Sequence, residues 1–209
     1  AVLEDCLHSL AAQDERLPLL LQLPGVSLLT AMTILAAIGD ISRFPDPKHL
    51  LGYAGLGGRV HDSGQTTRTG RITKAGRKDL RAAMVEAAQA AANTHPHWKA
   101  ELARLEPRLG RNKAIVAIAR KLLVAVWHVL SYGVADVHAE PERVARKFIQ
   151  TAYSLGKARR PAGQSTGDYA RQRLDRLNIG QDLKIVPWGS KKKPIPLPPS
   201  ALPKSADTV

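Results

Sequence analysis

Ser63 is the residue of this sequence whose surroundings best fit phosphate chemistry. It lies in the stretch 53–81, YAGLGGRVHDSGQTTRTGRITKAGRKDLR, where seven Lys or Arg accompany two acids between Arg59 and Arg81. A serine hydroxyl is a weak nucleophile that needs a base or a charged environment. Phosphoryl transfer in turn needs cations where negative charge builds up on the phosphate. We therefore predict a basic loop that meets a phosphodiester, with Ser63 as the nucleophile.

The neighbours of Ser63 suggest individual roles. His61 is the candidate to accept the hydroxyl proton, and Arg59, Arg68, Arg71 and Lys74 are the nearest candidates to stabilise charge on the phosphate. Arg77, Lys78 and Arg81 at the helix start are expected to hold a nucleic-acid backbone. The nucleic-acid-binding candidates of this stretch are Gly64, Arg68, Arg71, Lys74, Arg77, Lys78 and Arg81. Taken alone, a Ser-Gly pair also fits an ordinary turn, which is the alternative interpretation of Ser63.

The charge of the chain points to the same kind of partner. The 209 residues carry a formal net charge of +13, yet residues 1–40 are acidic, with five acids and one base. A surplus of this size indicates a polyanionic partner, most often nucleic acid. We expect the binding surface after residue 40; the alternative is that the charge merely keeps an oligomerisation domain soluble.

Composition restricts the fold and the cofactors. Apolar residues make up 44% of the chain and aromatic residues 4%, which favours closely packed, alanine-rich helices over a β-sandwich. The lone cysteine, Cys6, excludes an internal disulfide and a cysteine metal cluster, and we expect no metal in this chain. The longest uncharged apolar run, 122–135, is too short for a membrane span of about 20 residues. We expect a cytoplasmic, nucleoid-associated prokaryotic protein without a membrane.

The chain begins with a leucine-striped segment. Leucines at 3, 7, 10, 17 and 20 or 21 predict one helix over 1–21. We interpret it as the end of a coiled coil that forms a homo-oligomer. The alternative is that the stripe packs on its own domain.

The next stretch, LPGVSLLTA, resembles a helix-hairpin-helix turn. Such a turn exposes backbone N–H groups to a phosphate at a helix N-terminus. Gly25 fits the first glycine of the pattern, and Ser27 stands in place of the second, where it can cap the helix 28–38. Both are nucleic-acid-binding candidates, and a tight turn that touches no DNA is the alternative.

The remaining periodicity predicts a mainly α protein with a compact helical domain over 22–156. Helices are expected over 47–54, 78–93, 96–108, 113–132 and 141–155, with short extended pieces at 57–61 and 71–73. Residues 157–209 are basic and proline-rich, and we expect a largely disordered tail with one short helix over 169–177. Such a tail adds non-specific nucleic-acid affinity or serves only solubility.

Three segments in order carry a resemblance to a known family. LPGVSLLTAMTILAAIGDISRF, LLGYAGL and DSGQTTRTGRITKAGRKDLRAAMVEAA resemble the C-terminal domain of transposases of the insertion-sequence 110/116/902 family, over about residues 20–135. The resemblance implies that Ser63 attacks the scissile phosphate of DNA and leaves a phosphoserine link and a free 3′ hydroxyl. Arg59 departs from the pattern, since family members often have proline there.

The same resemblance implies parts that this sequence does not contain. Family members carry an N-terminal nuclease-like domain in which four carboxylates bind Mg²⁺, joined through a coiled coil, and an RNA guides the choice of DNA. We therefore expect DNA and a guide RNA as partners, and no strand transfer by this chain without that domain. The alternative function is a non-catalytic helix-hairpin-helix module that binds nucleic acid.

Overall fold

The computed structural model describes residues 2–63, 66–189 and 193–203, with residues 2, 3, 5, 59–63, 66–71 and 162 described by their backbone only. Within this part the chain has nine α-helices and two small two-stranded sheets, so the mainly α prediction is confirmed. It divides into two compact units: unit 1 joins Ala1–Leu23 to Gly133–Val209, and unit 2 is Pro24–Tyr132. This division differs from the expected one, because residues 133–156 belong with the N-terminal segment rather than with the central helices.

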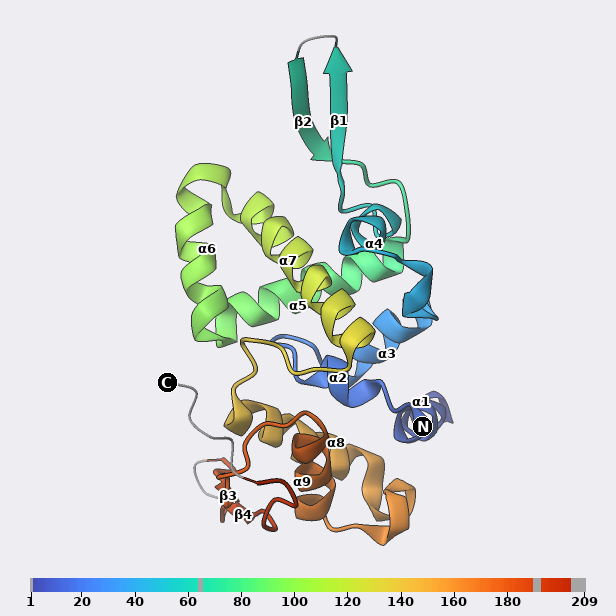
Figure 1. The fold of residues 1–209 in the computed structure, drawn as a ribbon, viewed down its shortest axis with the longest axis vertical. Helices are drawn as coiled ribbons and strands as arrows, with labels where there is room; N and C mark the ends of the chain where they lie inside the picture. The colour runs from blue at the N-terminus through green and yellow to red at the C-terminus, as the bar shows by residue number, and fades with distance from the viewer. Residues whose placement is uncertain (1, 64–65, 190–192, 204–209) are drawn as a thin grey trace. The chain divides into compact units, whose positions relative to one another are not determined.

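Unit 2 is a cluster of helices that carries one hairpin. Its helices pack around α5, which contacts α3, α6 and α7. The elements are α3 (Leu28–Ile38), a 3-10 turn η1 (Ile41–Arg43), α4 (Pro47–Tyr53), β1 (Gly58–Ser63), β2 (Thr66–Ile72), α5 (Lys78–Thr94), α6 (Pro96–Leu109) and α7 (Arg111–Tyr132). Figure 1 shows that the hairpin β1–β2 extends away from the helices of this unit, beyond α4.

Local capping sets the helix boundaries in unit 2. Ser27 accepts a hydrogen bond from the Thr30 N–H at the start of α3, and Asp46 does the same for His49 at the start of α4. Gly39, with φ +65°, ends α3. The predicted limits of these two helices are therefore confirmed within one residue.

The core of unit 2 uses small side chains to bring helices close. Four alanines of α5 are fully or almost fully buried, at 87, 88, 91 and 92, and Leu122 and Leu123 of α7 are fully buried. α7 is long and apolar enough to cross a membrane by length and composition, but half of its apolar stretch is buried within the fold. We therefore assign α7 to the core of a helical unit.

Unit 1 is assembled from the two ends of the chain. α8 contacts α1, α2 and α9, so it links the N-terminal to the C-terminal segment. The elements are α1 (Val2–Gln13), α2 (Leu17–Leu21), α8 (Pro141–Arg159), η2 (Pro161–Gly163), α9 (Thr166–Arg176), β3 (Ile185–Val186) and β4 (Ile195–Pro196). β3 and β4 pair antiparallel.

The expected single helix over 1–21 is wrong, because α1 ends at Gln13 and Asp14 lies outside any helix. The Asp14 carboxylate accepts hydrogen bonds from the backbone N–H and from the guanidinium of Arg16. Such a local bond offers the backbone an alternative to helix. A new helix, α2, then starts with Pro18 in its first turn, and all its residues are buried. The second half of the leucine stripe therefore lies in the core of unit 1.

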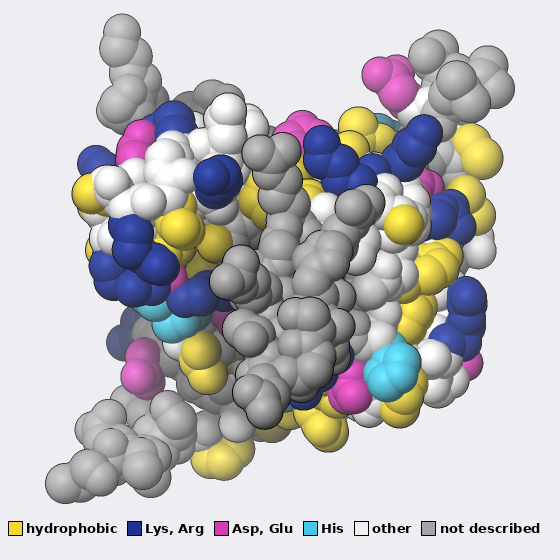
Figure 2. Space-filling view, turned by 90° about the horizontal axis from the view of Figure 1, so that it is seen from above, with side chains coloured by type: hydrophobic (Ala, Val, Ile, Leu, Met, Phe, Trp, Pro, Cys, Tyr) yellow, Lys and Arg dark blue, Asp and Glu magenta, His cyan; other side chains and the backbone are white. Residues whose placement is uncertain are grey.

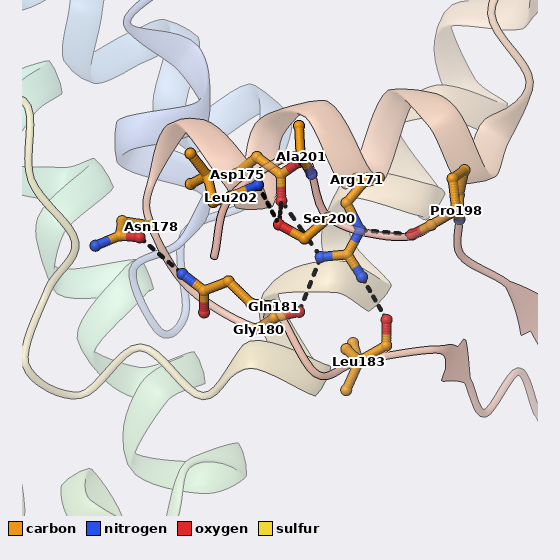
Figure 3. Close-up of polar contacts among 10 residues, drawn as sticks. All are labelled: Arg171, Asp175, Asn178, Gly180, Gln181, Leu183, Pro198, Ser200, Ala201 and Leu202. Carbon is orange, nitrogen blue, oxygen red and sulfur yellow. Dashed lines mark hydrogen bonds and ion pairs between the residues drawn. The ribbon is translucent and has the colours of Figure 1, made fainter. Parts of the chain in front are cut away.

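The segment after residue 157 is ordered over much of its described length, which differs from the expected disordered tail. Leu174, Leu177 and Val186 are buried. Arg171, 4% exposed, donates to the carbonyl oxygens of Gly180 (2.8 Å), Pro198 (2.9 Å) and Leu183, as Figure 3 shows. The basic, proline-rich composition had predicted disorder. The segment is ordered because one buried guanidinium donates hydrogen bonds to several carbonyl groups of an irregular chain.

Candidate nucleic-acid interface

The hairpin β1–β2 carries the predicted catalytic residues. Its strands run antiparallel, with Ser63 paired to Thr66 and His61 paired to Arg68. The register shifts between Gly58 and Val60, which marks a bulge near the base. Ser63 is the last residue of β1, so its backbone stands at the far end of the described ladder.

Six predicted site residues fall in or beside this ladder, and the structure gives their place only in part. Gly64 lies outside the described residues. The backbone of the other five, Arg59, His61, Ser63, Arg68 and Arg71, belongs to β1 or β2, while their side chains lie outside the described part. The structure therefore brings all five backbones into one hairpin, and their predicted chemical roles stay predictions.

A close backbone joint fixes the base of the hairpin to α4 and α5. The N–H groups of Lys74 and Arg77 donate to the carbonyls of Gly55 (3.1 Å) and Tyr53 (2.8 Å). A Cβ at Gly76 (φ +137°) would come 2.3 Å from the Tyr53 carbonyl oxygen. Only glycine tolerates this approach at such a φ, so the joint depends on it.

Arg81 has a structural task at this joint. Its guanidinium donates to the carbonyl oxygens of Ala54 (3.0 Å) and Lys74 (3.2 Å), which lie before and after the hairpin. A Cβ at Gly55 would lie 2.6 Å from this guanidinium. Arg81 therefore ties the two ends of the hairpin together, a role that its place in a basic run does not reveal.

Arg77 is held by an acid and a tyrosine. It forms an ion pair with Asp79 (2.9 Å) and donates to the Tyr53 hydroxyl (3.3 Å), which itself donates to the Ala37 carbonyl (3.0 Å). The hydrogen bond from Arg77 lowers the pKa of the Asp79 carboxyl. Asp79 also accepts from the Leu80 N–H in the first turn of α5, so an acid already offsets part of the basic helix start.

Lys74 and Lys78 are two of the predicted nucleic-acid-binding cations, and their ammonium groups take part in none of the contacts within the described residues. Both are exposed, and neither ammonium group has a hydrogen bond or ion pair within the part of the chain that the structure describes. Lys74 has a positive φ of 53°, an unusual conformation for a residue with a side chain. The two lysines flank the joint and are free to meet phosphates.

Gly25 and Ser27 both have structural roles in the turn before α3. A Cβ at Gly25 would lie 2.0 Å from the Ala87 carbonyl oxygen and 2.7 Å from the Ala91 nitrogen, so the turn packs directly on α5. The Ser27 hydroxyl caps α3 and lies 2.8 Å from the Thr30 hydroxyl. The turn thus has a packing reason for its residues, and phosphate binding by it stays a prediction.

Sequence reasoning missed the aromatic support beneath the hairpin. The Phe44 and Tyr53 rings lie 5.2 Å apart, and the Arg43 guanidinium lies 5.5 Å from the first and 5.7 Å from the second. Trp127 of α7 donates to the Phe44 carbonyl (2.8 Å). The aromatic residues are visible in the sequence, but only the fold brings them together under α4.

Figure 2 shows Lys and Arg in several groups separated by apolar and acidic side chains, among the described side chains in view. No group of three or more His, Cys, Asp or Glu that could hold a metal ion occurs within the described residues. Residues 59–81, which form most of the hairpin and the joint at its base, contain seven Lys or Arg in sequence and are therefore the candidate nucleic-acid contact.

Comparison with known proteins gives this region a family. The description Transposase IS116/IS110/IS902 family matches residues 17–103, which include the hairpin, the joint and the turn at Gly25. The chain is 36% identical over 121 residues to a pilin gene-inverting protein of Moraxella bovis, covering 56% of this chain and 37% of that protein. It is 32% identical over 133 residues to the transposase for insertion sequence element IS1111A of Coxiella burnetii, covering 61% of this chain and 36% of that protein.

This chain thus spans little more than a third of the length of these relatives. Within that part, the match covers the segments on which the resemblance rests, and the resemblance is confirmed. Residues 17–103 match the IS116/IS110/IS902 transposase family.

Proposed function

We propose that this chain is the part of a DNA transposase that binds nucleic acid and supplies Ser63 as nucleophile for strand cleavage and exchange. The observation that carries the proposal is the position of Ser63 at the far end of a projecting, arginine-containing hairpin inside the family-matched region. A projecting hairpin can enter the vicinity of a DNA strand without moving the helical core. The backbone hydrogen bonds of the joint anchor the base of this hairpin to the helices.

The proposed reaction is an attack of the Ser63 hydroxyl on a scissile phosphodiester. The Oγ–P bond forms, the bond from phosphorus to the 3′ oxygen breaks, and the hydroxyl proton passes to His61 as general base. The 3′ oxygen takes a proton from water and leaves as a free hydroxyl. Attack by a second strand's 3′ hydroxyl on the phosphoserine reverses these steps and completes the exchange.

The cations of the hairpin region have two proposed tasks. Arg59, Arg68 and Arg71 stabilise the charge that develops on the phosphate. Lys74 and Lys78, with their exposed and unused ammonium groups, hold the strand beside the joint. We also propose that the chain binds a guide RNA and forms a homo-oligomer through α1. The Mg²⁺ would be held by a separate nuclease-like domain, and no Mg²⁺ site is assigned to this chain.

A covalent trap tests the serine chemistry. The probe is a duplex of randomised sequence around one 3′-bridging phosphorothiolate, whose sulfur leaves more easily than oxygen and does not re-ligate. Because no strand transfer is expected from this chain alone, it is assayed joined to the nuclease-like domain of a family member, and we expect an adduct that peptide mass spectrometry locates at Ser63. The adduct should disappear in Ser63→Ala and persist in Ser63→Cys and in the control Ser131→Ala, an exposed serine of α7.

Binding is measured in parallel, so that loss of chemistry is separated from loss of contact. DNA affinity of the unchanged chain should fall at least about tenfold between about 50 and 200 mM salt, as counterion release requires. Intact, salt-dependent binding without an adduct at Ser63 would reject the serine chemistry and support the alternative of a non-catalytic nucleic-acid-binding module. Affinity that hardly changes with salt would support the alternative in which the charge serves only solubility.

A further inference from the structure

Unit 1 contains a cavity that lies apart from the hairpin in the sequence. Its volume is about 370 Å³, and it opens between the end of α1 and one side of α9. Its polar wall is made by side chains from these two places: Asp14, Glu15, Tyr169, Gln172, Arg173 and Arg176. All of them belong to unit 1, and none is among the residues assigned to the hairpin site.

Arg173 is the central group of this wall. Its guanidinium lies 3.3 Å from the centre of the Tyr169 ring, and among the described residues it donates long hydrogen bonds to the Tyr169 carbonyl (3.3 Å) and the Gln172 side chain (3.4 Å). Its Nε is buried and has no hydrogen-bond partner within the described residues. No carboxylate of that part forms an ion pair with Arg173, and burial lowers the pKa of its guanidinium.

A partly buried cation without an anion is costly unless a ligand supplies one. Desolvation weakens the charged form, and an N–H left without an acceptor loses the free energy of a hydrogen bond. A guanidinium is the group that proteins use to bind phosphate through two parallel hydrogen bonds. The Nε itself is too buried for a ligand to reach, so a phosphate oxygen would bind the part of the Arg173 guanidinium that lines the cavity.

The two acids of the wall do not close the site to anions. Asp14 is held by the Arg16 guanidinium (2.7 Å), which lowers the pKa of its carboxyl and offsets its charge. Glu15 is 82% exposed and pairs with Arg176 at 3.2 Å. An exposed pair of this kind contributes about 1 kcal/mol at most, so Arg176 can turn to a ligand at little cost.

We propose that this cavity is a second site, which binds the phosphate of a nucleotide through Arg173 and Arg176. The volume falls in the range of small-ligand sites and exceeds what a bare phosphate requires. Arg173 covers one face of the Tyr169 ring, so a base does not stack on that face, and the remaining volume holds the rest of the nucleotide. The phosphate belongs either to a free mononucleotide or to a nucleic-acid strand, and the second case rests on the proposed function.

The resonance of the Arg173 Nε–H group in the whole chain gives a direct test. It is followed by ¹H–¹⁵N NMR during titration with thymidine 5′-monophosphate, inorganic phosphate and an eight-residue oligothymidylate. We expect a saturable shift of Arg173 with the mononucleotide and little change at Arg146, an exposed arginine of α8 in the same unit. Arg176→Gln should weaken the binding about tenfold, by loss of one charge-assisted hydrogen bond.

The possible results separate cleanly. A shift with both nucleotide probes indicates a strand-binding site, and a shift with the mononucleotide alone indicates a free nucleotide. A shift at Arg173 no larger than that at Arg146, or equal affinity for inorganic phosphate and mononucleotide, overturns the proposal. Arg173→Lys, which keeps the charge but loses Nε, should retain the fold and lose the affinity. None of these results depends on an adduct at Ser63, so the two proposals fail independently.

Discussion

Units 1 and 2 hold their segments together by different means. Unit 2 is one continuous stretch of chain, and its tightest contact is backbone against backbone, where Gly25 meets α5. Unit 1 joins two distant stretches, and Arg171 holds its irregular end through three carbonyl groups. The first means depends on the absence of a side chain, and the second on one large polar side chain. Each therefore has its own weak point.

The largest effect is expected where unit 2 has no room. Gly25→Ala places a methyl group 2.0 Å from the Ala87 carbonyl oxygen, so α5 must move. We expect a loss of at least about 4 kcal/mol in the free energy of unfolding, measured with urea.

Gly110→Ala is the matched control for this change. Gly110 has the same φ of +76°, but a Cβ there would meet nothing within 4 Å. Only the backbone strain remains, on the order of 1 kcal/mol. Equal losses in the two variants would show that close approach to α5 does not stabilise unit 2.

A smaller, more local effect is expected in unit 1. Arg171→Met removes the donors to Gly180, Leu183 and Pro198, and we expect a loss of about 3 kcal/mol. Hydrogen exchange should accelerate over 178–202 and stay unchanged over 24–132. The exposed Arg146→Met serves as the control and should change neither region. Uniform acceleration across both units would contradict the independence of the two packing solutions.

The smallest effect is expected for a polar link in unit 2. Glu101 of α6, whose side chain is 10% exposed, pairs with Arg104 (2.8 Å) and with Lys121 of α7. The hydrogen bonds from Arg104 and Lys121 lower the pKa of Glu101 to about 2, from an ordinary 4.5. At pH 7, Glu101→Gln should cost about 1 kcal/mol of unfolding free energy.

The pH dependence of that difference follows from the direction of the shift. A carboxyl with a lowered folded-state pKa contributes fully above its unfolded value and loses the contribution as pH falls through the folded value. The difference between the unchanged chain and the variant should therefore persist above pH 4.5 and vanish towards pH 2. Glu106→Gln, in an exposed pair with Arg111 at 3.7 Å, should cost less than about 0.5 kcal/mol. A pH-independent difference at Glu101 would rule out the ion pairs as its cause.

Helix limits were predictable wherever a local signal set them. Asp46 before Pro47 and Ser27 before Leu28 mark helix starts through side-chain caps. Gly156, with φ +71°, interrupts α8 one residue after the predicted end of that helix. These signals act within a few residues and need no knowledge of the fold.

The sequence predicted which residues the candidate site contains, but not which of them make structural contacts and which are exposed. The sequence identifies the basic stretch, and the family match supports it. It does not distinguish Arg81, which donates to two carbonyls, from Lys78, which is exposed. The cavity around Arg173 was not predictable from the sequence either, because its two walls come from segments far apart in the chain.

The sequence by itself determined that the protein is mainly α, where most of its helices begin, and which transposase family its residues 20–135 resemble. Those properties depend on apolar periodicity, caps and motif order, which are local. Only the tertiary structure decided that the leucine stripe breaks at Asp14, that the proline-rich end folds around Arg171, and that Gly25 packs on α5. The last two depend on contacts between residues distant in sequence, whereas the break at Asp14 combines a local hydrogen bond to Arg16 with the burial of α2.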